Sequence, residues 1–273
     1  MVKSRAKTSH EKTSKKKKIF FIRLTDYDLQ FTTKFMSFAI LIAISFSAGF
    51  FFESIIGFGG GIIAYAILGF FIDLKEMVIA GLYVGTLASA YIAASDFKQF
   101  DKKIFISLIP LSLVGTVFGV LIFSRFSSQS LAFLLGILLI ILAVKTIFFD
   151  RVVFPKFFKN KLIFIGGISH GIFGLGGPFV VNAIKNKFKN KSSLRTTMAV
   201  FFVLLNLVRI PQLLWQNQLQ LEFFITIWWT IIPVFIAIKL GHLIHLKISE
   251  DTFKKGIAIM TIFAGLKFLS KVL

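Results

Sequence analysis

Two glycine-rich motifs carry the residues best suited to bind a ligand in this sequence. Residues 57–61 read GFGGG and residues 174–178 read GLGGP, each inside a long apolar run. Clustered glycines and a proline interrupt a helix there, which frees backbone amides whose partial positive charge favours an anion. We therefore expect an anion site between the motifs, with close helix packing through small residues as the alternative. The candidate ligand-binding positions are Gly57, Gly59, Gly60, Gly61, Gly174, Gly176, Gly177 and Pro178.

An ionisable residue lies four positions before each motif. These residues are Glu53 and His170, and both fall within apolar runs. An ionisable side chain at membrane depth is costly unless it faces a partner or a cavity, so both are expected to point into the protein. They are candidate proton-coupling groups, because a carboxylate and an imidazole can change charge during transport. A satisfied buried pair, or a glutamate close to the membrane interface, is the alternative.

A buried cation is predicted near the end of a later apolar run. Arg209 lies one turn after Asn206 on the same helix face. The guanidinium offers a rigid fork of donors that suits sulfur and phosphorus oxyanions. Arg209 and Asn206 are therefore candidate ligand-binding residues. The alternative is an arginine that reaches the lipid head groups, because Trp215 suggests an interface close by.

The composition indicates an all-α, polytopic membrane protein. The chain has 273 residues, of which 56% are hydrophobic, and a mean hydropathy of +0.83. Its repeated apolar runs match the length of about twenty residues that a helix needs to cross a bilayer. They lack the strict alternation of a membrane β-barrel. With no cysteine and four histidines, the sequence predicts no metal site and no cofactor, and its spans show no converging catalytic groups, so an enzyme is not expected.

Basic residues predict how the chain is oriented. The net charge is +20, with lysine and arginine concentrated in the segment 1–34 and in the loops. Cytoplasmic loops of membrane proteins are rich in these residues, so the segment is predicted to be a cytoplasmic tail near anionic lipid. Nucleic acid is not an expected partner. The protein is expected in the cell membrane as a multi-pass protein with seven to ten membrane-spanning segments.

The sequence divides into two similar halves. A shift of 117 residues lays the first motif on the second (57 to 174), and later spans match at a shift of 122 (119 to 241). The predicted parts are a tail at 1–34, a first repeat at 35–149, a basic linker at 150–161 and a second repeat at 162–273. Equivalent loops fall on opposite sides by their charge, which predicts an inverted repeat with discontinuous helices at the two motifs.

The sequence resembles the sulfite exporter TauE/SafE family of membrane permeases. The resemblance covers roughly residues 35–273 and rests on Glu53–Gly61, Leu74–Ser89 and His170–Pro178. It implies a duplicated transporter fold that moves sulfite, sulfonates or related anions across the cytoplasmic membrane. The long lysine-rich tail and the 36 phenylalanines are departures that the family does not explain.

These observations together predict a secondary transporter. The expected activity is proton-coupled export of a small sulfur-containing anion such as sulfite or an organosulfonate. The alternatives are an anion channel or a permease for another small carboxylate or oxyanion, with a membrane-embedded enzyme as a weaker third. The expected partners are the anionic substrate, the lipid bilayer and protons, and the sequence leaves the oligomeric state open.

Overall fold

The computed structural model describes residues 36–55, 59–148, 156–188, 190–219, 221–244 and 250–270. The predicted tail at 1–34 therefore lies outside the described residues, as do Gly57 and residues 150–155 of the linker. The chain divides into two compact units, Met1–Ile40 and Leu41–Leu273. In the first unit the described residues, 36–40, are helical. The contacts discussed below all belong to the second unit.

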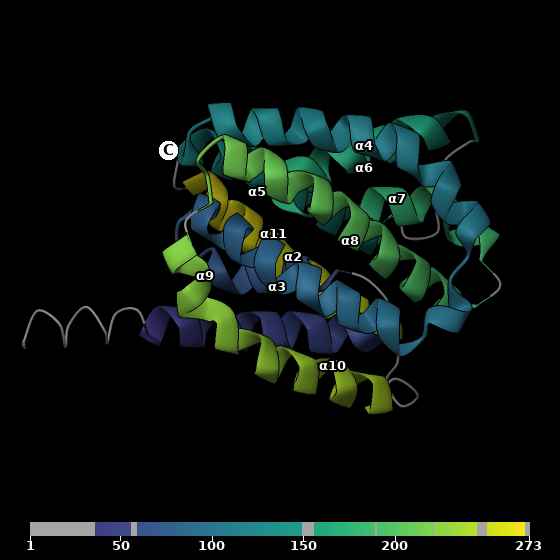
Figure 1. Cartoon of the computed structure of the whole chain (residues 1–273), viewed down its shortest axis with the longest axis horizontal. Coiled ribbons are helices and arrows are strands. Elements are labelled where there is room, and N and C mark those ends of the chain that lie inside the picture. Colours follow the sequence, from purple (N-terminus) through teal and green to yellow (C-terminus); the bar gives the residue numbers. More distant parts are fainter. Residues whose placement is uncertain are drawn as a thin grey trace, which may run out of the picture. The chain divides into compact units, whose positions relative to one another are not determined.

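Regular structure in the described residues is entirely helical, which confirms the predicted fold class (Figure 1). The α-helices are Met36–Ile55, α2 Gly60–Leu68, α3 Leu74–Ser95, α4 Lys102–Arg125, α5 Ser128–Phe148, α6 Lys159–Phe173, α7 Gly177–Ile184, α8 Lys191–Trp215, α9 Leu221–Ile227, α10 Ile231–Ile244 and α11 Glu250–Ser270. Single 3₁₀ turns lie at Phe97–Gln99, Lys156–Phe158, Lys185–Lys187 and Trp228–Thr230. Among the described residues, six helices are long and apolar enough to cross a membrane.

Polar side chains determine where three of the long helices begin. Asp73 accepts a hydrogen bond from the backbone N–H of Lys75 at the start of α3. Asp101 accepts one from Ile104 at the start of α4, and Asn190 does the same at the start of α8. Each cap satisfies an amide that has no partner within its helix. The apolar runs in the sequence begin at Met77, Ile104 and Leu194, so these helices start two or three residues before them.

Helices α4 and α6 pack side by side through small residues (Figure 1). A Cβ atom on Gly119 would lie 2.3 Å from the carbonyl oxygen of Ile168, and one on Gly167 would lie 2.5 Å from that of Ser112. The Thr116 hydroxyl donates to the carbonyl of Gly167 at 3.3 Å. Such close backbone approach maximises dispersion contacts where no hydrophobic effect drives helices together in lipid. Helix α6, which precedes the second glycine motif, is therefore held firmly against α4.

The two halves make matching contacts between their helices. Gly119 of α4 approaches Ile168 of α6, and Gly241 of α10 approaches the carbonyl oxygen of Phe51, where a Cβ would lie 2.4 Å away. The two sequence shifts pair these same residues: the shift of 122 relates Gly119 to Gly241, and the shift of 117 relates Phe51 to Ile168. This agreement suits two structurally similar halves. Their opposite orientation in the membrane stays a prediction.

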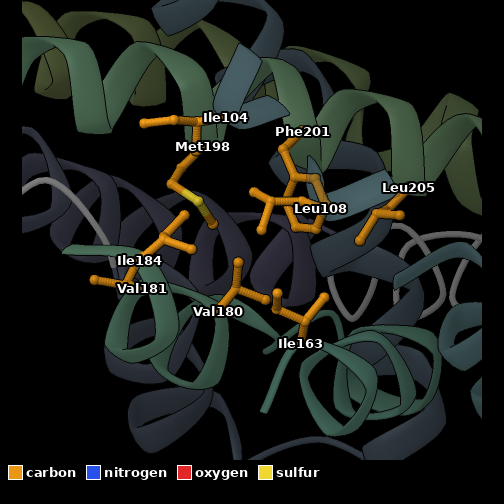
Figure 2. Packing of buried hydrophobic residues seen from close by; sticks show 9 residues of the cluster. All are labelled: Ile104, Leu108, Ile163, Val180, Val181, Ile184, Met198, Phe201 and Leu205. Atoms are coloured by element: carbon orange, nitrogen blue, oxygen red, sulfur yellow. The ribbon is translucent and has the colours of Figure 1, made fainter. Parts of the chain in front are cut away.

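A buried apolar cluster joins α4, α6, α7 and α8 (Figure 2). Its nine members are Ile104, Leu108, Ile163, Val180, Val181, Ile184, Met198, Phe201 and Leu205. Three of them come from the short helix α7, whose apolar side packs against the longer helices. A helix of eight residues has little stability alone, so this packing is what holds α7 in place. By contrast, many large apolar side chains on the long helices are exposed, as suits contact with lipid, including Phe118, Ile141, Leu207 and Ile236.

Substitution of Gly119 by leucine should destabilise the protein, because its Cβ would overlap the backbone of α6. We expect the free energy of unfolding to fall by about 1–3 kcal/mol, the usual cost of overpacking. Thermal unfolding of the purified protein in detergent would measure it. Gly85→Ala is the matched control, since a Cβ there meets nothing within 4 Å. Equal melting temperatures for both variants would contradict the packing described.

Candidate functional site

The second glycine motif forms a tight turn between α6 and α7. Helix α6 ends at Phe173, and Gly174 follows with φ = 75°, a left-handed conformation that glycine adopts without strain. Its N–H donates to the carbonyl of His170 at 2.7 Å. A Cβ on Gly176 would lie 2.4 Å from the carbonyl oxygen of Gly166, so α7 begins close against α6. The chain thus turns back on itself at this motif.

The first glycine motif leads into α2 and is held by a carboxylate. Gly59 has φ = 100° and caps the N-terminus of α2, whereas Gly57 lies outside the described residues. The N–H of Gly60 donates to Oε2 of Glu53 at 2.7 Å. A Cβ on Gly60 would lie 2.8 Å from the carbonyl oxygen of Gly49, so α2 also folds back against the preceding helix. The side chain of Glu53 therefore supplies an acceptor for an amide at the start of α2, where the helix dipole favours one.

The two motifs lie against each other. A Cβ on Gly61 would come within 2.9 Å of Cδ2 of Leu175. Between them is a cavity of about 60 Å³, which we call the central cavity. Its lining includes Phe46, Phe50, Glu53, Gly59, Gly61, Ile62, Tyr65, Gly81, Gly85, Ser89, His170, Gly174, Leu175, Gly177, Pro178, Phe202, Asn206 and Arg209. A volume of this size accommodates about four water-sized groups.

Arg209 is the largest polar side chain enclosed beside the central cavity, with 1% of its surface exposed. Its Nη1 donates to Oδ1 of Asn206 at 3.3 Å, and Nε2 of His170 lies 3.0 Å from the same oxygen. The His170 ring stacks on Phe202 with centroids 5.3 Å apart. Within the described part of the chain, Nε and Nη2 of Arg209 and Nδ1 of His170 have no hydrogen-bond partner. Because Nε2 of His170 donates to the Asn206 oxygen, Nδ1 of the neutral ring is an acceptor, so the unpartnered donors beside the cavity are those of Arg209.

Tyr65 was not singled out from the sequence, yet it joins the two motifs. It lies on α2 with 2% of its surface exposed. Its hydroxyl donates to the carbonyl of Phe173, the last residue of α6, at 2.8 Å. A Cβ built on Gly174 would lie 3.3 Å from Nη1 of Arg209 and 3.7 Å from the Tyr65 hydroxyl. The only sequence signal for a role of Tyr65 is its position inside an apolar run. An aromatic residue of the core has the same signal.

The structure gathers most of the predicted site residues at the central cavity. Nine of them line it: Glu53, Gly59, Gly61, His170, Gly174, Gly177, Pro178, Asn206 and Arg209. Gly60 and Gly176 instead allow close backbone packing, the alternative that the sequence had left open. Glu53 and His170 do not bond to each other, because each has a different partner. Within the described residues, no three histidine, aspartate or glutamate side chains are placed to hold a metal ion.

Comparison with known proteins supports the resemblance seen in the sequence. The model of the sulfite exporter TauE/SafE family matches residues 41–268. A curated relative, the probable inner membrane transporter protein TsaS of Comamonas testosteroni, is 20% identical over 175 residues, which cover 63% of this chain and 73% of that protein. No solved structure matches the chain. These matches confirm the expectation of a membrane transporter rather than an enzyme, and the chain belongs to the sulfite exporter TauE/SafE family.

Proposed function

We propose that this protein is a secondary transporter that exports a small sulfur oxyanion, such as sulfite or an organosulfonate, in exchange with or together with protons. The central cavity is the binding site, and Arg209 with Asn206 holds the anion. The basic tail at 1–34 lies in the cytoplasm beside anionic lipid. Family membership supports the class of substrate, and the chemistry of the cavity supports the position of the site.

The observation that carries this proposal is the incomplete hydrogen bonding of Arg209. Among the described residues its side-chain acceptor is Asn206, which is neutral and is shared with His170. Two further guanidinium nitrogens have no partner among the described residues. Burying a cation without a counter-charge costs several kcal/mol, and an anion in the cavity would offset that cost. Oxyanions suit this position because a guanidinium binds two oxygens at once.

The two glycine motifs contribute unequally to the proposed site. Helix α7 begins at Gly177, which lines the central cavity together with Pro178, so the positive end of its dipole is available to a ligand. At the start of α2 the N–H of Gly60 is already bonded to Glu53. The anion is therefore held from the α7 and Arg209 side, not in a symmetrical cradle.

Glu53 is the group we assign to proton coupling. Its carboxylate lines the same cavity as Arg209 and carries a negative charge that opposes an anion there. Protonation removes that charge and weakens the bond to Gly60, so proton uptake and anion occupancy are linked. His170 acts with it by holding the oxygen of Asn206 in place.

Replacement of Arg209 by glutamine should abolish most transport. Loss of the buried cation removes about 2 kcal/mol or more of anion binding, which is roughly a 30-fold rise in KM or more. Radiolabelled sulfite flux in proteoliposomes would measure it. Arg209→Lys should retain part of the activity, since it keeps the charge but not the fork. Arg125→Gln, at an exposed position at the end of α4, is the control for lost charge. Unchanged flux in folded Arg209→Gln protein would exclude this site.

Replacement of Glu53 by glutamine should uncouple transport from protons. The amide oxygen of glutamine can still accept from Gly60, so the fold is expected to persist. Flux of methanesulfonate, whose own charge does not change with pH, should then no longer respond to an imposed pH gradient. Glu76→Gln, at an exposed position on α3, is the matched control and should keep the response. A gradient response equal to that of the wild type would assign coupling to another group.

A further inference from the structure

The side of α8 that carries the proposed site has a second arginine. Phe202, Asn206 and Arg209 line the central cavity from this helix. Arg195 precedes Arg209 by 14 residues, and at 100° per residue the two side chains differ in direction by only about 40°. At 1.5 Å per residue they are about 21 Å apart along the axis. Arg195 therefore continues the same line of side chains toward the start of α8.

Arg195 is partly buried but incompletely bonded. Its Nη1 lies 3.2 Å from Nδ1 of His242 on α10. Its Nε is buried and has no hydrogen-bond partner among the residues that the structure describes. The carboxylate of Asp96 accepts a hydrogen bond from Ser192 and also acts electrostatically on Arg195. The guanidinium thus keeps one donor without a partner in the described part of the chain, while Asp96 offsets part of its positive charge.

Arg195 also interacts electrostatically with the edge of the central cavity. The residue on which it acts there is Glu53, which lines the cavity on the side of α2. An anion that leaves Arg209 toward the start of α8 would be repelled by this carboxylate. The positive charge of Arg195, which acts on Glu53, offsets that repulsion and attracts the anion onward.

We propose that Arg195 is a second binding residue for the transported oxyanion, placed at the mouth of the pathway between the central cavity and the end of the protein where α8 begins. The proposal rests on the transport function proposed above and adds the route by which the anion enters or leaves the central cavity. Substrate arriving or leaving at this end pairs transiently with Arg195 before or after it pairs with Arg209. Arg195 accordingly sets the rate of capture and release, whereas Arg209 sets the occupancy of the cavity.

A purely structural role for Arg195 makes a different prediction. In that case the residue only holds α8 in place through His242 of α10 and through Asp96, and either His242→Ala or Asp96→Asn would lower flux as removal of Arg195 does. Under our proposal the His242→Ala variant keeps the cation and transports normally. Lys103, which is exposed at the start of α4 close to α8, provides a control for general surface charge.

The first experiment compares initial rates of sulfite flux in proteoliposomes over a range of concentrations. Arg195→Gln should lower the ratio of maximal rate to KM on the order of tenfold, the usual size of a steering effect, and should flatten its dependence on ionic strength. Arg195→Lys should recover most of the rate, while His242→Ala and Lys103→Gln should match the wild type. Wild-type kinetics in Arg195→Gln, or an equal defect in His242→Ala, would overturn the proposal.

A second experiment changes the charge after the protein has folded. The chain contains no cysteine, so Arg195→Cys places a single thiol at the proposed mouth. A cationic ethylammonium thiosulfonate reagent should raise flux in this variant, and its anionic sulfonate counterpart should lower it further. Neither reagent should affect the wild type. Identical responses to both reagents would show that charge at this position does not matter.

Failure of this inference can be distinguished from failure of the proposed function. Calorimetric titration of sulfite into detergent-solubilised protein reports on the central cavity alone. Arg195→Gln should bind with nearly wild-type affinity, whereas Arg209→Gln should bind about 30-fold more weakly or worse. Absence of sulfite binding and flux in the wild type would reject the proposed function, while normal wild-type flux that is insensitive to Arg195 would reject only the route.

Discussion

A cation enclosed within the membrane-spanning helices, with one neutral acceptor beside it, is the constraint on which the site depends. Arg209 is almost fully buried, and Asn206 must serve both it and His170. In a medium of low polarity such a charge is tolerated where a counter-charge can reach it. The surrounding contacts keep the guanidinium beside the central cavity. Tyr65 bonds to the end of α6, which keeps the turn at Gly174 next to the guanidinium.

Glycine serves two separate purposes in this structure. At Gly59 and Gly174 the left-handed backbone makes the turns that end one helix and begin another. At Gly119, Gly167 and Gly176 the lack of a side chain lets backbones approach closely, which replaces the hydrophobic effect that lipid cannot provide. The close packing matters for the turns, since a turn beside a ligand keeps its geometry only when the helices flanking it cannot move.

The two halves are similar in helix packing but differ in the charged side chains they carry. The repeat lays Glu53 on His170, so one half contributes a carboxylate where the other has an imidazole. Arg209 corresponds to Leu87 in the first half (209 − 122 = 87). Glu53 consequently occupies the amide at the start of α2, and the positive charge lies on the α7 side. A duplicated backbone thus gives a one-sided site, because side chains diverge while helix packing is retained.

The sequence by itself determined the features that depend on local chemistry. Apolar runs indicated membrane helices, glycine clusters indicated where regular structure is difficult to maintain, and Glu53, His170 and Arg209 stood out because charge is costly in such runs. The tertiary structure decided which of these groups meet. The bond from Tyr65 to Phe173 spans 108 positions, and that from His170 to Asn206 joins different helices. Partners so distant follow from the packing register of whole helices, which no local pattern encodes.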